Sequence, residues 1–219
     1  MILELRQYTL HPGRRDVLIE LFEREFVEPQ EEVGIEVVGQ FRDLDRPDHF
    51  VWIRGFPTME ARKAALSAFY GGPVWAAHKD AANATMIDSD DVLLLRPAGP
   101  DTGFPSEPGA DDAALTTATI YSFAEPVTDT VLDLVEREVE PLLPHRSALL
   151  CTESSANTYP ALPVREGEQV IVRFGRYADE HAHAAADSAR RQATAILAPH
   201  LRSAPVELRL APTPRSSLR

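Results

Sequence analysis

The chain has little of what marks secreted or membrane-spanning proteins. Its 219 residues contain one cysteine, Cys151, so an internal disulfide is impossible. No apolar run approaches the roughly eighteen residues that a membrane span requires. Residues 1–6 (MILELR) lack the basic start and apolar stretch of a signal peptide. We therefore expect a soluble, cytoplasmic protein with no membrane partner.

Positive charge is also scarce. The chain has 22 Lys and Arg residues against 34 Asp and Glu, which gives a net charge of −12 at pH 7. An acidic surface repels phosphate backbones, so no nucleic-acid partner is expected. A glycine-rich nucleotide loop, a metalloprotease helix and a paired-cysteine site are all missing. His181 and His183 are two residues apart, which separates them around a helix, so we expect no metal site there.

The first half of the chain is predicted to have the order strand, helix, strand, strand, helix, strand. Alternating and β-branched runs predict the strands, and spacings of three to four residues between apolar side chains predict the helices. Thr58 is a predicted helix cap, and the Gly71-Gly72-Pro73 stretch interrupts the second helical region. The predicted elements are strands at 3–10, 35–41, 50–54 and 92–95, and helices through 18–26 and from 58 to about 86.

The second half repeats this order. Strands are predicted at 117–123, 148–152, 169–174 and 206–210, with helices through 131–142 and 179–201. Tyr8 and Val92 are 84 residues apart, while Tyr121 and Val206 are 85 residues apart, which indicates a degenerate internal duplication. The segment between the halves is rich in proline, glycine and acidic residues, as linkers are. We therefore predict units at 1–97 and 114–212, a linker at 98–113 and a disordered tail at 213–219.

The fold class that follows is α+β, with two tandem ferredoxin-like βαββαβ units. Each unit forms a four-stranded antiparallel sheet with both helices on one face, which leaves the other face bare. Two bare faces that meet make a single-chain, pseudo-dimeric α/β barrel, so a monomer is one expectation. Pairing between two chains in a homodimer is the competing arrangement.

Four segments of the first half resemble the NIPSNAP family. They are 5–13 (LRQYTLHPG), 41–45 (FRDLD), 50–56 (FVWIRGF) and 69–75 (FYGGPVW) with His78, and the similarity covers about residues 1–96. The resemblance implies the dimeric α/β barrel fold, which is also found in antibiotic-biosynthesis monooxygenases, polyketide cyclases and haem-binding aldoxime dehydratases. It implies no agreed reaction, so function has to be argued from the site.

Arg54 and Arg173 occupy matching places on the third strand of each half. Trp52 lies on the same strand face as Arg54, because side chains alternate along a strand. One interpretation makes the two arginines anchors for a carboxylate, phenolate or enolate substrate. The other pairs an arginine with an interior carboxylate such as Glu4 or makes it an edge residue, and we favour this second interpretation.

Trp75 and His78 are three residues apart in a predicted helix and share a face, with Tyr70 just before the glycine pair. This pattern is typical of an aromatic wall beside a general base, with His78 as the base. The more common arrangement is aromatic core packing beside a half-exposed histidine. Haem ligation by His78 is a smaller possibility, because no second axial ligand stands nearby.

Two further residues complete the predicted site. Tyr8 matches Tyr121 across the repeat, so it lies either near a pseudo-symmetric centre or in an equivalent core position. Asn83 follows His78 by five residues and either orients a ligand or caps the helix. We thus expect catalytic roles for His78 and Arg54, and ligand binding by Trp52, Trp75, Tyr70, Tyr8, Asn83 and Arg173.

These residues favour a cofactor-independent enzyme that binds an apolar or aromatic small metabolite. The reaction expected is an oxygenation, cyclisation or isomerisation of the kind found in secondary metabolism. A non-catalytic ligand-binding or protein-interaction module is the alternative, since no complete catalytic constellation is visible. A haem-binding protein is the second alternative, and otherwise no cofactor is expected.

Overall fold

The structure, a computed structural model, describes residues 1–105, 114–144 and 146–218. The chain divides into two compact units. The first unit contains Met1–Leu95, Glu153–Glu166 and Pro212–Leu218, and the second contains Arg96–Thr152 and Gly167–Ala211. Within the described part of the chain, no helix is both long and apolar enough to cross a membrane.

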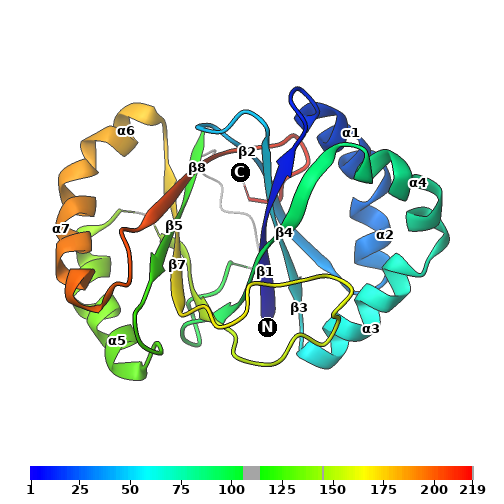
Figure 1. Ribbon diagram of the computed structural model, residues 1–219. Coiled ribbons are helices and arrows are strands. Elements are labelled where there is room, and N and C mark those ends of the chain that lie inside the picture. The colour runs from blue at the N-terminus through cyan, green and yellow to red at the C-terminus, as the bar shows by residue number, and fades with distance from the viewer. Residues whose placement is uncertain (106–113, 145, 219) are drawn as a thin grey trace. The chain divides into compact units, whose positions relative to one another are not determined.

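The first unit has the predicted order of elements. In chain order these are β1 (Ile2–Leu10), α1 (Arg15–Glu25), α2 (Val27–Glu32), β2 (Glu36–Asp43), β3 (His49–Phe56), α3 (Met59–Tyr70), α4 (Pro73–Asn83) and β4 (Met86–Pro97). Strand β1 pairs antiparallel with both β3 and β4, and β2 pairs antiparallel with β3. The sheet order is therefore β4-β1-β3-β2, with all four helices along one side of the sheet (Figure 1).

Local sequence explains the helix boundaries that matter for the site. The Thr58 hydroxyl accepts a hydrogen bond of 3.1 Å from the Ala61 amide, so it caps the N-terminus of α3. Between α3 and α4, a Cβ atom on Gly71 would lie 2.7 Å from the Ser67 carbonyl oxygen, and one on Gly72 would lie 2.9 Å from that of Ala68. Only glycine permits this tight turn, which sets the positions of the two helices that flank it.

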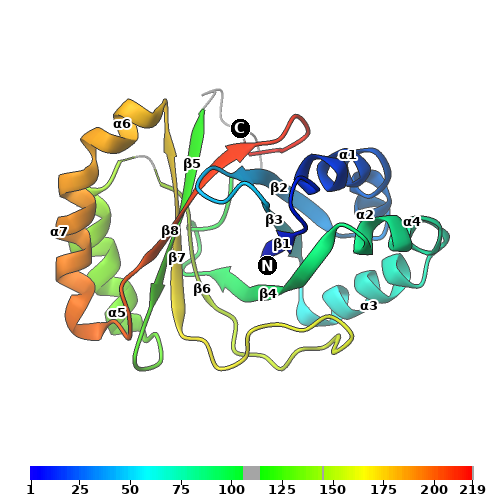
Figure 2. The same ribbon diagram turned by 45° about the horizontal axis from the view of Figure 1, so that its top comes forward.

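The second unit repeats the strand arrangement. It contains β5 (Leu115–Ser122), α5 (Asp129–Leu134), a π-helical turn η1 (Val135–Val139), a 3-10 turn η2 (Glu140–Leu142), β6 (Arg146–Thr152), β7 (Val170–Tyr177), α6 (Glu180–Ala185), α7 (Asp187–Leu197), a 3-10 turn η3 (Ala198–His200) and β8 (Val206–Pro212). The pairings give the order β8-β5-β7-β6. Helices α5, α6 and α7 lie along one face of this sheet (Figure 2).

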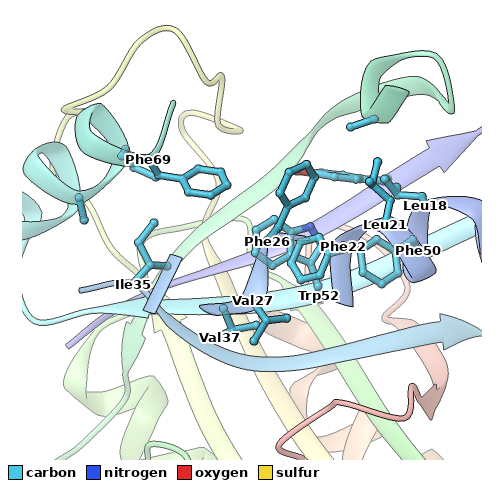
Figure 3. Packing of buried hydrophobic residues seen from close by; sticks show 14 of the residues in the cluster. Leu18, Leu21, Phe22, Phe26, Val27, Ile35, Val37, Phe50, Trp52 and Phe69 are labelled. Atoms are coloured by element: carbon cyan, nitrogen blue, oxygen red, sulfur yellow. The ribbon is translucent and has the colours of Figure 1, made fainter. Parts of the chain in front are cut away.

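The core of the first unit is an aromatic layer between its sheet and its helices. Phe22 lies against Trp52, with ring centroids 4.8 Å apart, and Phe26 meets Phe69 edge to face at 5.9 Å. These rings converge in Figure 3 from α1, the α1–α2 junction, α3 and β3. Edge-to-face contacts of this kind stabilise the layer beyond the area that it buries.

Two segments of the first unit come from parts of the chain that the sequence predicted to lie in the second unit or in the tail. Glu153–Glu166, here called the returning segment, interrupts the predicted second unit at 114–212. Its ends are held on β4, because the Glu153 amide donates to the Leu94 carbonyl and the Arg165 amide donates to that of Val92. A long loop with few apolar residues gives no sequence signal for such docking.

The tail predicted to be disordered at 213–219 is ordered at 213–218. Thr213 and Ser216 are buried, and both form hydrogen bonds with Gln40 of β2. These bonds satisfy the backbone carbonyl and amide of Gln40, an interaction between distant positions that no local pattern in the sequence indicates. Of the predicted linker at 98–113, residues 106–113 lie outside the described part of the chain, as does residue 219.

Smaller differences concern helix ends. The helix predicted to continue to about residue 86 ends at Asn83, and Met86 begins β4 instead. The helix predicted at 179–201 is divided at Ala186 into α6 and α7. Apolar spacing alone does not detect such breaks, since the side chains on both sides still face the core.

Candidate functional site

A fully buried carboxylate in the first unit is surrounded by three arginines. Glu4 of β1 accepts from Arg6 Nη1 at 2.6 Å and from Arg54 Nε at 2.7 Å, both through Oε2. Its other oxygen, Oε1, accepts from Arg62 Nε at 2.6 Å. Among the described residues, Glu4 is the one carboxylate within ion-pair distance of these guanidinium groups. We call these four residues the arginine cluster.

The cluster shifts the pKa of its members. Burial by itself would raise the pKa of Glu4, but the guanidinium groups of Arg54, Arg6 and Arg62 outweigh it and hold that pKa well below the usual range. Burial raises the pKa of Tyr8, and the positive charge of Arg6 opposes this effect only in part. Glu4 is therefore ionised and Tyr8 is a neutral phenol at neutral pH.

Strand alternation and helix spacing bring the cluster together. Glu4, Arg6 and Tyr8 alternate along β1, so they point to the sheet face that the helices cover. Arg62 precedes Leu66 by four residues on the buried side of α3. The pairing of Glu4 with Arg54 confirms the interpretation that we favoured from the sequence.

Further polar groups surround the guanidinium ends. The Tyr8 hydroxyl accepts from Arg6 Nε at 3.1 Å, and the Tyr70 hydroxyl accepts from Arg54 Nη1 at 3.3 Å. Arg62 Nη1 donates to Asn157 Oδ1 at 3.0 Å and to Thr158 Oγ1 at 3.3 Å, both in the returning segment. Three buried donors in and beside the arginine cluster find no acceptor among the described residues, namely Arg54 Nη2, Arg62 Nη2 and Trp52 Nε1.

A small cavity adjoins the cluster between the sheet and the helices. Its volume is about 30 Å³, and its wall includes Tyr8, Trp52, Tyr70 and Trp75, all predicted site residues. A water molecule needs at least about 10–15 Å³ by this measure, so the cavity has room for one or two. Gln30 also lines it, and the Oε1 atom of Gln30 finds no donor among the described residues.

The cluster and the cavity share their aromatic residues. The guanidinium carbon of Arg54 lies 5.1 Å from the Trp52 ring centroid, and that of Arg6 lies 5.6 Å from it. Tyr70 contacts Arg54 through its hydroxyl and lines the cavity with its ring. The Tyr159 ring of the returning segment stacks on Tyr70, with centroids 6.2 Å apart. A cationic surface thus lies directly behind one wall of an aromatic cavity.

Two predicted site residues lie away from the cavity wall. His78 is half-exposed, with its Nε2 atom 3.4 Å from a carboxylate oxygen of Glu25. Its ring lies 6.3 Å from that of Phe26, on the outer side of the aromatic layer. Asn83 is exposed at the end of α4. Helical spacing brings Trp75 to the cavity but does not bring His78 there.

The corresponding residues of the second unit have different partners. Arg173 donates from Nε to Glu140 at 2.9 Å and from Nη2 to the Pro144 carbonyl at 3.0 Å. Burial raises the pKa of Tyr121 to about 12. Tyr121 lines an open groove of about 480 Å³ with Arg190 and Glu207. Arg54 and Arg173 therefore each form an ion pair with a glutamate of their own unit. Among the described residues, Arg173 is not part of an arginine cluster like that of the first unit.

Sequence reasoning missed Arg6, Arg62 and the returning segment. A signal existed for Arg6, because a charged residue interrupts the apolar face of β1 between Ile2 and Leu10. Arg62 likewise stands on the buried face of α3. The hydrogen bonds from Arg62 to Asn157 and Thr158 cross about a hundred residues of chain, and no local pattern indicates them.

The surroundings of His78 do not form a haem pocket. The one histidine considered as an axial ligand, His78, does not line the cavity, and about 30 Å³ is far too small for a porphyrin. Within the described ranges, no group of three or more His, Cys, Asp or Glu side chains is arranged to hold a metal ion.

Solved structures with a similar fold span nearly the whole chain. An anthrone oxidase-like protein has a TM-score of 0.63 and 16% sequence identity, covering 97% of this chain and 91% of its own. A proposed monooxygenase from Fusobacterium nucleatum has a TM-score of 0.61, 11% identity, and coverages of 96% and 91%. Another from Lactobacillus acidophilus has a TM-score of 0.58, 14% identity, and coverages of 96% and 93%. At such low identity, the likeness concerns the fold alone.

Sequence comparison detects a known domain in the first half of the chain. Among curated proteins, none is significantly similar in sequence to this chain. The NIPSNAP family model matches residues 3–100, which include β1 to β4 and the whole arginine cluster. This match confirms the resemblance found in the four sequence segments. Residues 3–100 of the chain therefore form a NIPSNAP domain.

Proposed function

We propose that the NIPSNAP domain binds a small aromatic or apolar metabolite between its sheet and its helices. The observation that carries this proposal is the shared wall of the cavity, where Tyr8, Trp52, Tyr70 and Trp75 meet beside buried guanidinium groups. Aromatic side chains with a few convergent polar groups are typical of small-molecule sites.

The proposed activity is cofactor-independent oxygenation, cyclisation or isomerisation of an enolisable ring compound. In the oxygenation, a substrate CH₂ group and O₂ yield C=O and H₂O, so the substrate itself supplies the electrons. The similar folds of an anthrone oxidase-like protein and of two proposed monooxygenases support this class of chemistry. Fold similarity alone does not determine the substrate.

The cavity can hold a ring-bearing ligand only if its wall moves. Pockets for ring-bearing ligands usually have volumes of about 300–1,000 Å³, whereas this cavity has about 30 Å³. Tyr70 and Trp75 are half-buried and flank the glycine turn between α3 and α4. An outward shift of these two rings is the opening that we propose.

Tryptophan fluorescence provides a direct test. The chain has two tryptophans, and both line the cavity. Titration with phenols, naphthols and anthrone is expected to change the emission in a saturable way, and the change at Trp52 should persist in Trp75→Phe. Oxygen uptake and mass spectrometry of the products then test the oxygenation. No saturable change with any of these compounds would contradict binding in this pocket.

A non-catalytic ligand-binding module is the second proposal. It is favoured by the cavity wall, whose titratable groups are the two phenols of Tyr8 and Tyr70. A general base with a pKa near neutrality is not among these residues, since His78 lies outside the wall. Saturable binding without turnover of any titrated compound would support this function.

We also propose that the two units pair within one chain as a pseudo-dimeric barrel. Support comes from the solved structures that span 96–97% of the chain with a similar fold. Light scattering that reports a monomer is expected. A stable dimer would favour pairing between chains or through the helices.

A further inference from the structure

The arginine cluster holds more positive charge than its carboxylate neutralises. Three guanidinium groups surround one carboxylate, and the side chains of Glu4, Arg54 and Arg62 have no exposed surface. Tyr8 does not supply a second negative charge, because burial raises its pKa. Buried charges are stable only when they are paired, so this excess selects for an anion.

The donors that an anion needs are present in fixed positions. Arg54 and Arg62 each donate from Nε to a different oxygen of Glu4, and the Nη2 atom of each finds no acceptor among the described residues. One arginine comes from β3 and the other from α3, so their orientation is set by two different elements. Fixed guanidinium groups of this kind bind oxyanions in the forked geometry that suits carboxylates.

Two of the three residues that carry unpaired donors, Arg54 and Trp52, are linked to the cavity wall. The Tyr70 hydroxyl accepts from Arg54 Nη1, and the Tyr70 ring forms part of the cavity wall. Trp52 contacts Arg54 with its ring and carries the third unpaired donor, Nε1. A ring held in the opened cavity would therefore direct an anionic group toward Arg54, which shares the Glu4 carboxylate with Arg62.

We propose that Arg54 and Arg62 form an oxyanion site for a ligand that carries a carboxylate, phenolate or enolate. The site deepens the proposed function and rests on it, since the aromatic body of the same ligand occupies the cavity. Its anionic group neutralises the positive charge of the arginine cluster that Glu4 leaves uncompensated.

The returning segment positions one half of this site. Arg62 is held from one side by Glu4 and from the other by Asn157 and Thr158. Thr158 in turn donates to the Met59 carbonyl at the start of α3, at 3.1 Å. Asn157 closes its own loop by donating to the Leu162 carbonyl at 2.9 Å. Asn157 is therefore a positioning residue for the Arg62 guanidinium.

Pairs of probes that share a ring but carry either a carboxylate or a neutral amide test the oxyanion site. Benzoate and 1-naphthoate are compared with benzamide and 1-naphthamide, by calorimetry and tryptophan emission at neutral pH. We expect each carboxylate to bind at least about tenfold more tightly than its amide. Arg62→Gln should remove most of that preference, whereas Arg24→Gln, at an exposed arginine of α1, should keep it.

Three milder variants keep the test informative if Arg62→Gln fails to fold. Arg62→Lys keeps the charge but loses the fork, so a part of the preference should remain. Asn157→Asp places a carboxylate beside Arg62 and should weaken carboxylate binding more than Asn157→Ala, with amide binding unchanged. A purely structural role of Asn157 would affect carboxylates and amides alike.

The outcomes separate the two proposals. If carboxylates and amides bind equally well, the oxyanion site is wrong while binding in the pocket stands. If neither kind of probe binds at any concentration up to its solubility limit, the proposed function fails and the oxyanion site fails with it.

Discussion

Arg62 and Glu4 are 58 positions apart in the chain and form an ion pair of 2.6 Å between two fully buried side chains. Burying both charges is costly, and only the mutual pairing makes it tolerable. The pair therefore links the start of the sheet to α3, and it places a guanidinium group beside an aromatic cavity. Several expectations for stability and binding depend on it.

Removing the carboxylate should destabilise the protein strongly. Glu4→Gln leaves three buried guanidinium groups without a negative partner, and breaking a buried pair in this way costs about 3–5 kcal/mol. Urea unfolding measures the loss of free energy. The control is Glu20→Gln at an exposed position of α1, which should change it by less than about 0.5 kcal/mol. A small effect of Glu4→Gln would mean that the cluster is solvated.

The stability of the protein should depend on pH through Glu4. The arginines lower the pKa of folded Glu4 below the usual value of 4.5, so the unfolded state takes up the proton first. This contribution is complete above about pH 4.5 and is lost as the pH falls toward the folded pKa. Thermal unfolding of the wild type and Glu4→Gln is measured from neutral pH to about pH 3. The difference in Tm between the two proteins should become smaller as the pH falls. A difference in Tm that stays constant with pH would contradict the pairing of Glu4 with the arginines.

Removing His78 should leave ligand binding intact. His78 lies outside the cavity wall and pairs with Glu25 near the surface, where such pairs contribute about 0–1 kcal/mol. We expect His78→Ala to keep the fluorescence titration of the wild type, whereas Trp75→Ala should weaken it. A large loss of turnover in His78→Ala, with binding unchanged, would instead make His78 the general base.

The cap of α3 should affect stability moderately. Thr58→Ala removes the acceptor of the Ala61 amide, and the loss of such a cap costs about 1 kcal/mol. Thr58→Ser keeps the hydroxyl and serves as the control. Equal unfolding free energies for the two variants would show that the cap contributes nothing.

Deleting the residues after Pro212 should destabilise the first unit. The deletion removes the hydrogen bonds of Thr213 and Ser216 to Gln40, each worth about 0.5–1.5 kcal/mol when buried. Differential scanning calorimetry is expected to show a lower Tm. An unchanged Tm would instead support the prediction from the sequence that this tail is disordered.

Local patterns were enough to predict much of the first unit. Alternation along residues 3–10 and 50–54 predicted β1 and β3, and it placed Trp52 and Arg54 on one face. The Thr58 cap and the glycine turn bounded α3 and α4. These features arise from interactions over a few residues, which is why the sequence reveals them.

The composition of the site was decided by tertiary structure. Period-two alternation predicts which face Glu4 occupies, but not that Arg62 of α3 reaches its second oxygen. Helical spacing grouped His78 with Trp75, although only Trp75 lines the cavity. Asn157 and Thr158 reach Arg62 across almost a hundred residues. The sequence by itself determined the elements and the direction of their side chains, because those depend on neighbouring residues. Packing decided which charges meet, because burial forces each charged group to find a partner wherever the folded chain supplies one.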